Sequence, residues 1–158
     1  MRNFIFYSSL KSLVIGCQEI QELGDYHHMS MKQFLKEVAT IKISGSRRMG
    51  HTTAIVQFLI ERNTPAVVLL PNHSILRNFQ ELYAKMASES RWDHLVAPEV
   101  LSYQNFEKWA TGRNMGFYEA LIVDNSSFMS ESMKERIYDI LSGGFFTDSK
   151  PCFVIFVQ

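Results

Sequence analysis

The central stretch of the sequence is Gly45-Ser46-Arg47-Arg48-Met49-Gly50-His51-Thr52-Thr53. It follows a short β-branched run over residues 41–44 and precedes an apolar helical pattern over residues 54–60. A glycine-bounded loop between a strand and a helix can direct main-chain N–H groups at a phosphate, and the helix N-terminus adds partial positive charge. The spacing Gly-x4-Gly-x-Thr matches the phosphate-binding pattern except at one position. The competing interpretation is a turn that only joins a strand to a helix.

The exception is His51, which stands where the pattern has lysine. Histidine is shorter than lysine and is half-charged only near pH ~6.5. A bound polyphosphate would favour the protonated imidazole. Loss of one charge-assisted hydrogen bond costs roughly 1.5–3 kcal/mol, or about ten- to a hundred-fold in affinity. The sequence therefore predicts weakened nucleotide binding.

Length and composition fit one α/β domain with a hydrophobic core, since the 158 residues are 46% hydrophobic. Sixteen basic and sixteen acidic residues cancel, so no overall field attracts nucleic acid or an acidic membrane. Cys17 and Cys152 lack the spacing of a zinc site or a disulfide framework, and we expect small buried side chains in a reducing cytoplasm.

The N-terminal region, residues 1–29, is expected to be an amphipathic helical extension that covers one side of the core. Its apolar stretch is interrupted by Lys11 and several serines, which argues against a lipoprotein signal ending at Cys17 and against a membrane span. Tyr26 is a hypothetical stacking partner for a base. The adjacent His27 and His28 have no evident third ligand, so we expect a surface pair rather than a metal site.

Residues 30–158 show alternating strand and helix patterns. Expected helices cover 29–40, 52–62, 74–86, 103–110 and 130–141, and expected strands cover 41–44, 66–70, 95–101, 120–124 and 152–158. The continuous apolar runs are typical of buried parallel strands. We therefore expect a three-layer α/β/α sandwich with a mostly parallel five-stranded sheet and an N-terminal helical segment.

The run Ala120 to Val123 ends in Asp124, and the last strand ends in Gln158. Together with the glycine loop, these elements resemble the Walker A, Walker B and sensor motifs of P-loop NTPases of the additional-strand, RecA-like class. The loop is most similar to that of phage large-terminase ATPase domains, which share their core with helicases. The resemblance covers roughly residues 30–158. It implies ATP and Mg²⁺ as ligands, and a sheet in which the strand near residue 152 lies between the loop strand and the Asp124 strand.

The resemblance also implies roles for individual residues. Nucleotide phosphates would be bound by the loop, and the Mg²⁺ site would be formed by Thr52 and the outer-shell Asp124. Gln158 matches the sensor of the γ-phosphate, so Asp124 and Gln158 are the candidate catalytic residues. Either Arg47 or Arg48 could supply the cation that His51 lacks; the alternative is an exposed pair in a turn.

A second departure is Asn125, because this class usually has a glutamate base after the Walker B aspartate. An amide cannot accept the proton of the attacking water, and general-base assistance contributes about 10²- to 10⁴-fold. Glu131 is the nearest following glutamate, but nothing in the sequence assigns it this role. We expect weak or absent ATPase activity.

Three functions remain open at this stage. The first is a degenerate nucleotide-binding domain that regulates or scaffolds a phage-like DNA-processing machine in the (host) cytoplasm. The second is a slow ATPase activated by oligomerisation or by DNA. The third is an interaction or inhibitor module that retains the fold without the ligand. DNA contact is not decided, because the basic residues are interleaved with glutamates and because Trp92 and Trp109 are expected to fill the core rather than stack on bases.

Overall fold

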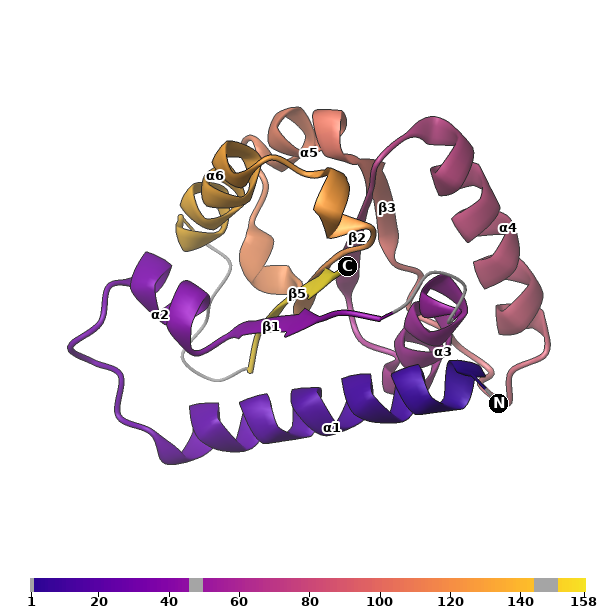
Figure 1. Cartoon of the computed structure of the whole chain (residues 1–158), viewed down its shortest axis with the longest axis horizontal. Coiled ribbons are helices and arrows are strands. Elements are labelled where there is room, and N and C mark those ends of the chain that lie inside the picture. Colours follow the sequence, from indigo (N-terminus) through magenta and orange to yellow (C-terminus); the bar gives the residue numbers. More distant parts are fainter. Residues whose placement is uncertain (1, 46–49, 144–150) are drawn as a thin grey trace.

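The computed structural model describes residues 2–45, 50–143 and 151–158, and shows a three-layer α/β fold (Figure 1). Its five strands form one parallel sheet in the order β1-β5-β4-β2-β3. The strands are β1 (Thr40–Ile43), β2 (Ala66–Leu70), β3 (Glu99–Ser102), β4 (Ala120–Val123) and β5 (Phe153–Val157). The helices are α1 (Arg2–Leu23), α2 (Met31–Glu37), α3 (His51–Arg62), α4 (His73–Ser88), α5 (Tyr103–Ala110) and α6 (Glu131–Ser142), with short 3₁₀ turns η1 (Met115–Phe117) and η2 (Ser126–Phe128). The predicted fold class is confirmed, and β5 lies between β1 and β4 as expected.

Two hydrophobic layers enclose the sheet. The helices α1, α3 and α4 pack on one face, and α2, α5 and α6 pack on the other (Figure 1). Successive strand residues alternate between the layers, so Val68 and Ile122 belong to the first, whereas Leu69 and Val123 belong to the second. Burial on both sides explains why the strands read as unbroken apolar runs.

Side-chain caps set several helix boundaries. Ser30, Asn72 and Ser130 each accept a hydrogen bond from the main-chain N–H three residues later, at the start of α2, α4 and α6. The helix expected over 29–40 is shorter, because Val38 and Ala39 both donate to the carbonyl of Phe34 and turn the chain into β1.

The strand expected over 95–101 begins later, at Glu99. Asn63 Nδ2 donates to the carbonyl of His94 (3.0 Å), and the N–H of Val96 donates to Asn63 Oδ1 (2.7 Å). These bonds hold residues 94–96 in a loop, so only the following residues pair with β2.

The N-terminal helix α1 is an integral part of the first layer. Five of its side chains belong to the same core cluster as the sheet: Phe6, Tyr7, Leu10, Val14 and Cys17. The helix is less amphipathic than expected, since several large apolar side chains also face outward. No helix within the described ranges combines the length and hydropathy needed to cross a membrane.

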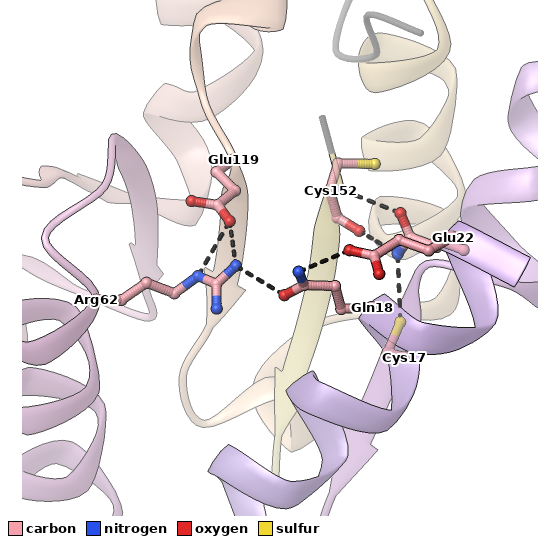
Figure 2. A network of polar contacts seen from close by, with 7 residues as sticks. Cys17, Gln18, Glu22, Arg62, Glu119 and Cys152 are labelled. Carbon is pink, nitrogen blue, oxygen red and sulfur yellow. Dashed lines mark hydrogen bonds and ion pairs between the residues drawn. The ribbon is translucent and has the colours of Figure 1, made fainter. Parts of the chain in front are cut away.

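A polar network joins α1 to the amino ends of the central strands. Figure 2 shows Arg62, at the end of α3, between Glu119, which precedes β4, and Gln18 of α1. Gln21 donates to the carbonyl of Cys152 (2.8 Å) and accepts from its N–H (3.1 Å). Cys17 and Cys152 are both free and buried, as predicted.

Candidate functional site

A cavity of about 670 Å³ lies at the carboxyl ends of β1, β4 and β5. It brings together all the described residues that the sequence suggested as a nucleotide or metal site, with three further residues that follow β4. The lining residues are Gly45, Gly50, His51, Thr52, Thr53, Asp124, Asn125, Ser127, Phe128 and Gln158. Residues 46–49 of the predicted loop, which are Ser46, Arg47, Arg48 and Met49, lie outside the described residues.

The N-terminus of α3 forms one wall of this cavity. Gly50 has a left-handed conformation (φ 73°, ψ 36°), which favours glycine, and the helix begins at the next residue. Gly50, at the N-cap, makes no side-chain cap hydrogen bond, and the first N–H groups of a helix have no intrahelical acceptor. These amides and the helix dipole favour an anion at this wall.

A buried carboxylate lies across from the helix. Asp124 follows β4 directly and is 1% exposed. Its Oδ2 accepts a hydrogen bond from Thr52 Oγ1 (3.0 Å), and its Oδ1 accepts one from the N–H of Asn125 (2.9 Å). Burial raises the pKa of Asp124, and the Thr52 hydroxyl, the Asn125 amide and His51 oppose that shift.

The pair fits the chemistry of a hard divalent cation. Mg²⁺ takes oxygen ligands, keeps several waters, and is bound in proteins by few carboxylates together with substrate phosphates. The buried Asp124 carboxylate with the Thr52 hydroxyl beside it supplies such oxygens, and a bound cation would compensate the buried charge. Thr52 and Asp124 are therefore the residues that would hold Mg²⁺ next to a phosphate at the α3 N-terminus.

Tyr103, which the sequence reasoning missed, fixes the chain after β4. Its hydroxyl donates to the main-chain carbonyls of Asp124 (2.5 Å) and Asn125 (2.9 Å). Asn125 is left-handed (φ 55°, ψ 41°), a conformation that asparagine tolerates better than most residues. Burial and the nearby Asp124 raise the pKa of Tyr103, so its hydroxyl stays protonated and remains a donor. The position of Tyr103 directly after β3 was the only signal in the sequence.

The residue in the lysine position contacts the N-terminal helix. The rings of His51 and Phe6 stack with centroids 4.2 Å apart and an interplanar angle of 28°. His51 Nε2 is buried and has no hydrogen-bond partner within the described part of the chain. The imidazole thus packs against Phe6 of α1, and its Nε2 is available to a further partner.

Gln158 lies at the mouth of the cavity, beside the start of the loop. Its main chain continues the β1–β5 pairing, because its N–H donates to Ile43 and its carbonyl accepts from Gly45. Its side-chain Oε1 accepts from Ser44 Oγ (3.3 Å). A polar amide therefore stands at the end of the strand between β1 and β4, where the resemblance implied a sensor.

Asp124 is the sole carboxylate among the described residues that line the cavity. Glu131, the nearest following glutamate, is 88% exposed at the start of α6 and pairs with Lys134 (2.8 Å). The described lining therefore contains no glutamate at the place where the resemblance implied a glutamate base.

Other candidates lie away from this cavity. The Tyr26 hydroxyl donates a hydrogen bond to the carbonyl of Ile20 (2.7 Å) near the end of α1. Tyr26 is not among the residues that line the cavity. His27 is fully exposed. Trp109 packs in the second layer as expected, but the prediction of a core position is wrong for Trp92, which is exposed in the loop after α4.

No family model matches this chain, and no curated protein matches it either.

Proposed function

We propose that this protein is a degenerate nucleotide-binding module of the P-loop type, which binds ATP weakly with Mg²⁺ and hydrolyses it little or not at all. In this role it would regulate or scaffold a DNA-processing assembly, in line with the terminase and helicase resemblance of its motifs. The observation that carries the proposal is the Thr52–Asp124 pair beside the N-terminus of α3, in one cavity with Gln158.

The chemistry of the cavity supports binding more than catalysis. Main-chain amides and the helix dipole would hold phosphate oxygens, and Thr52 and Asp124 would hold Mg²⁺. Mg²⁺ bound there would neutralise phosphate charge. Asn125 occupies the position of the usual base and cannot accept a proton, so an attacking water would lack general-base assistance worth about 10²- to 10⁴-fold.

The test is equilibrium binding of a fluorescent ATP analogue to the full chain, with Mg²⁺ and with EDTA. We expect measurable affinity that depends on Mg²⁺ and falls at least about tenfold in Asp124→Asn, which keeps the side-chain size but removes the charge. The matched control is Asp93→Asn, the same substitution at an exposed aspartate outside the cavity lining, which should keep the wild-type affinity. Absence of binding in the wild type, or equal binding by Asp124→Asn, would contradict the proposal.

Steady-state phosphate release from ATP, with and without DNA, then tests the proposal that the protein hydrolyses little or no ATP. We expect no release above background. Turnover of several ATP per second that Asp124→Ala abolishes would instead establish an active ATPase.

The stacking of His51 on Phe6 favours one second candidate, an interaction module that retains the fold without the ligand. This contact packs His51, which stands where the phosphate-binding pattern has lysine, against α1. Wild-type protein that binds neither ATP nor ADP with Mg²⁺ would support that function.

A further inference from the structure

The turn that follows β4 holds a large aromatic side chain in the open. Phe128 is the last residue of η2 and is 69% exposed. Its neighbours on either side are anchored in the protein, since Ser126 is fully buried and Met129 is 5% exposed. A single exposed apolar side chain is common on protein surfaces, so the exposure of Phe128 gains meaning only from its place in the fold.

The backbone fixes this aromatic ring outside the core. The N–H of Phe128 donates to the carbonyl of Asn125 (3.0 Å), and the N–H of Met129 donates to the carbonyl of Ser126 (3.1 Å). The Tyr103 hydroxyl also donates to the Asn125 carbonyl (2.9 Å). A ring carried by a turn that is already ordered loses little conformational entropy when a ligand packs on it.

Phe128 lines the cavity that contains the Thr52–Asp124 pair. It is the one large apolar side chain among the described lining residues, because the others are glycines or polar residues. Phe128 follows Asp124 by four positions, so the Cα atoms of the two residues are at most ~14 Å apart. One cavity therefore combines a polar wall for an anion and a cation with a flat apolar surface.

That combination matches the two unlike parts of a nucleotide. Its phosphates are charged and need N–H donors and a cation, whereas its base is flat and packs well on an aromatic ring. The volume of about 670 Å³ lies within the roughly 300–1,000 Å³ that is typical of small-molecule sites. The cavity thus offers each part of a nucleotide a surface of fitting chemistry.

We propose that the Phe128 ring is the stacking platform for the base of the nucleotide whose phosphates lie at the α3 N-terminus. This inference rests on the proposed function and adds to it the residue that holds the base. Stacking uses the π-face that every base has, so Phe128 selects for nucleotides over inorganic polyphosphates and discriminates little between bases.

Single-stranded DNA is a poorer occupant of this surface. Proteins that bind single strands combine a basic groove with several aromatic platforms. The described lining of the cavity has Phe128 and the carboxylate of Asp124, but neither lysine nor arginine. A mononucleotide with Mg²⁺ fits that lining better than a polynucleotide does.

The experiment is isothermal titration calorimetry of the full chain with ATP and, separately, with inorganic tripolyphosphate, both with Mg²⁺. Phe128→Ala should weaken ATP binding about tenfold and leave tripolyphosphate binding unchanged, because tripolyphosphate has no base. Phe128→Tyr keeps the ring and should keep the wild-type affinity for ATP. Phe128→Leu keeps an apolar side chain without a flat ring, so its loss should resemble that of Phe128→Ala.

Phe117→Ala is the matched control. Phe117 is the last residue of the other 3₁₀ turn, η1, and is 59% exposed, but it does not line the cavity. Its replacement should leave the affinities for ATP and tripolyphosphate unchanged. Thermal melting checks folding, and Phe128→Ala should melt as the wild type does, because the side chain that it removes is mostly exposed.

The two ligands separate failure of this inference from failure of the proposed function. A wild type that binds neither ATP nor tripolyphosphate would overturn the proposed function and the inference with it. If ATP bound and Phe128→Ala kept full affinity, the proposed function would stand and the stacking platform would be wrong. Equal losses for ATP and tripolyphosphate would also overturn the platform, since Phe128 would then act on the phosphate end. So would a Phe128→Ala variant that loses binding of a thymidine oligonucleotide and keeps its affinity for ATP.

Discussion

At the amino ends of the strands the polar side chains bind one another, whereas at the carboxyl ends they surround a cavity. Arg62, Glu119 and Gln18 form a chain of hydrogen bonds at the first end, and Gln21 satisfies both main-chain groups of Cys152 (Figure 2). At the second end Asp124 is buried with its pKa raised, and His51 Nε2 has no partner within the described residues.

The two ends of the sheet therefore differ in how fully their buried polar groups are paired within the described chain. Buried polar groups are normally paired, because an unpaired one loses its hydration without compensation. The amino end obeys that rule and so contributes stability. The carboxyl end leaves hydrogen-bonding capacity unused around a cavity, which is where a ligand can supply the missing partners.

The largest effect on stability is expected from Arg62→Met, which removes the central residue of the hydrogen-bond network at the amino ends of the strands. The Arg62 and Glu119 side chains are 24% and 13% exposed, and the guanidinium also lies 5.0 Å from the centre of the Phe153 ring. Removing one partner leaves a mostly buried carboxylate without its cation, so the free energy of unfolding should fall by about 2–3 kcal/mol. Urea denaturation measures this change in the free energy of unfolding.

Arg136→Met is the matched control for that prediction. Arg136 and Glu107 form a similar pair in which both side chains are 51% exposed, and water screens it. Its loss should leave the urea midpoint within error. Equal losses in the two variants would show that the amino-end network is no more than a surface ion pair.

A smaller loss of stability is expected from Tyr103→Phe, at the carboxyl ends of the strands where the cavity lies. The change removes the donor shared by the carbonyls of Asp124 and Asn125, which should lower stability by about 1–2 kcal/mol. Because the same hydroxyl fixes the chain that carries Asp124, Mg²⁺-dependent nucleotide affinity should fall as well. Unfolding and binding are measured on the same preparation.

Tyr138→Phe provides the comparison, since its hydroxyl bonds to Thr40 Oγ1 (2.8 Å) near the start of β1, away from the cavity. It should lose similar stability and keep its affinity. If Tyr103→Phe also kept full affinity, Tyr103 would be a purely structural residue.

The sequence predicted the cavity at the carboxyl ends of the strands better than the polar network at their amino ends, for physical reasons. Glycine spacing and a terminal aspartate are local signals, and parallel strands bring their carboxyl ends together, so the proximity of Thr52 and Asp124 followed from the fold class. The position of β5 between β1 and β4 came from the family resemblance alone.

The remaining contacts depend on tertiary packing that no local pattern encodes. Phe6 reaches His51 across 45 positions because α1 lies along α3, and Arg62 meets Glu119 only once α3 and β4 are placed. Tyr103 binds two main-chain carbonyls, whose direction is set by the left-handed turn at Asn125. The N-terminal helix itself was predicted, but the exposure of six large apolar side chains on α1 was not, because the sequence indicated an amphipathic helix.

The smallest expected effect is a pH dependence of stability that comes from the buried Asp124 at the carboxyl ends of the strands. Burial raises the pKa of this carboxyl above its ordinary value of 3.8, so the folded state binds the proton more tightly than the unfolded state. Stability contributed by Asp124 is then greatest at low pH and decreases as pH rises from about 4 through the folded pKa. Asp124→Asn retains the shape and removes the titration.

Subtracting the unfolding free energy of Asp124→Asn from that of the wild type at each pH isolates this one group from the other carboxylates. We expect the difference to become less favourable between pH 4 and neutrality, and Mg²⁺ with nucleotide to reverse the trend by favouring the ionised form. Glu107, whose pKa is lowered by Arg136, should show the opposite slope in the same subtraction with Glu107→Gln. A difference for Asp124 that rises with pH would mean that Thr52 and Asn125 already stabilise its charge fully, and that the carboxyl end is as well satisfied as the amino end.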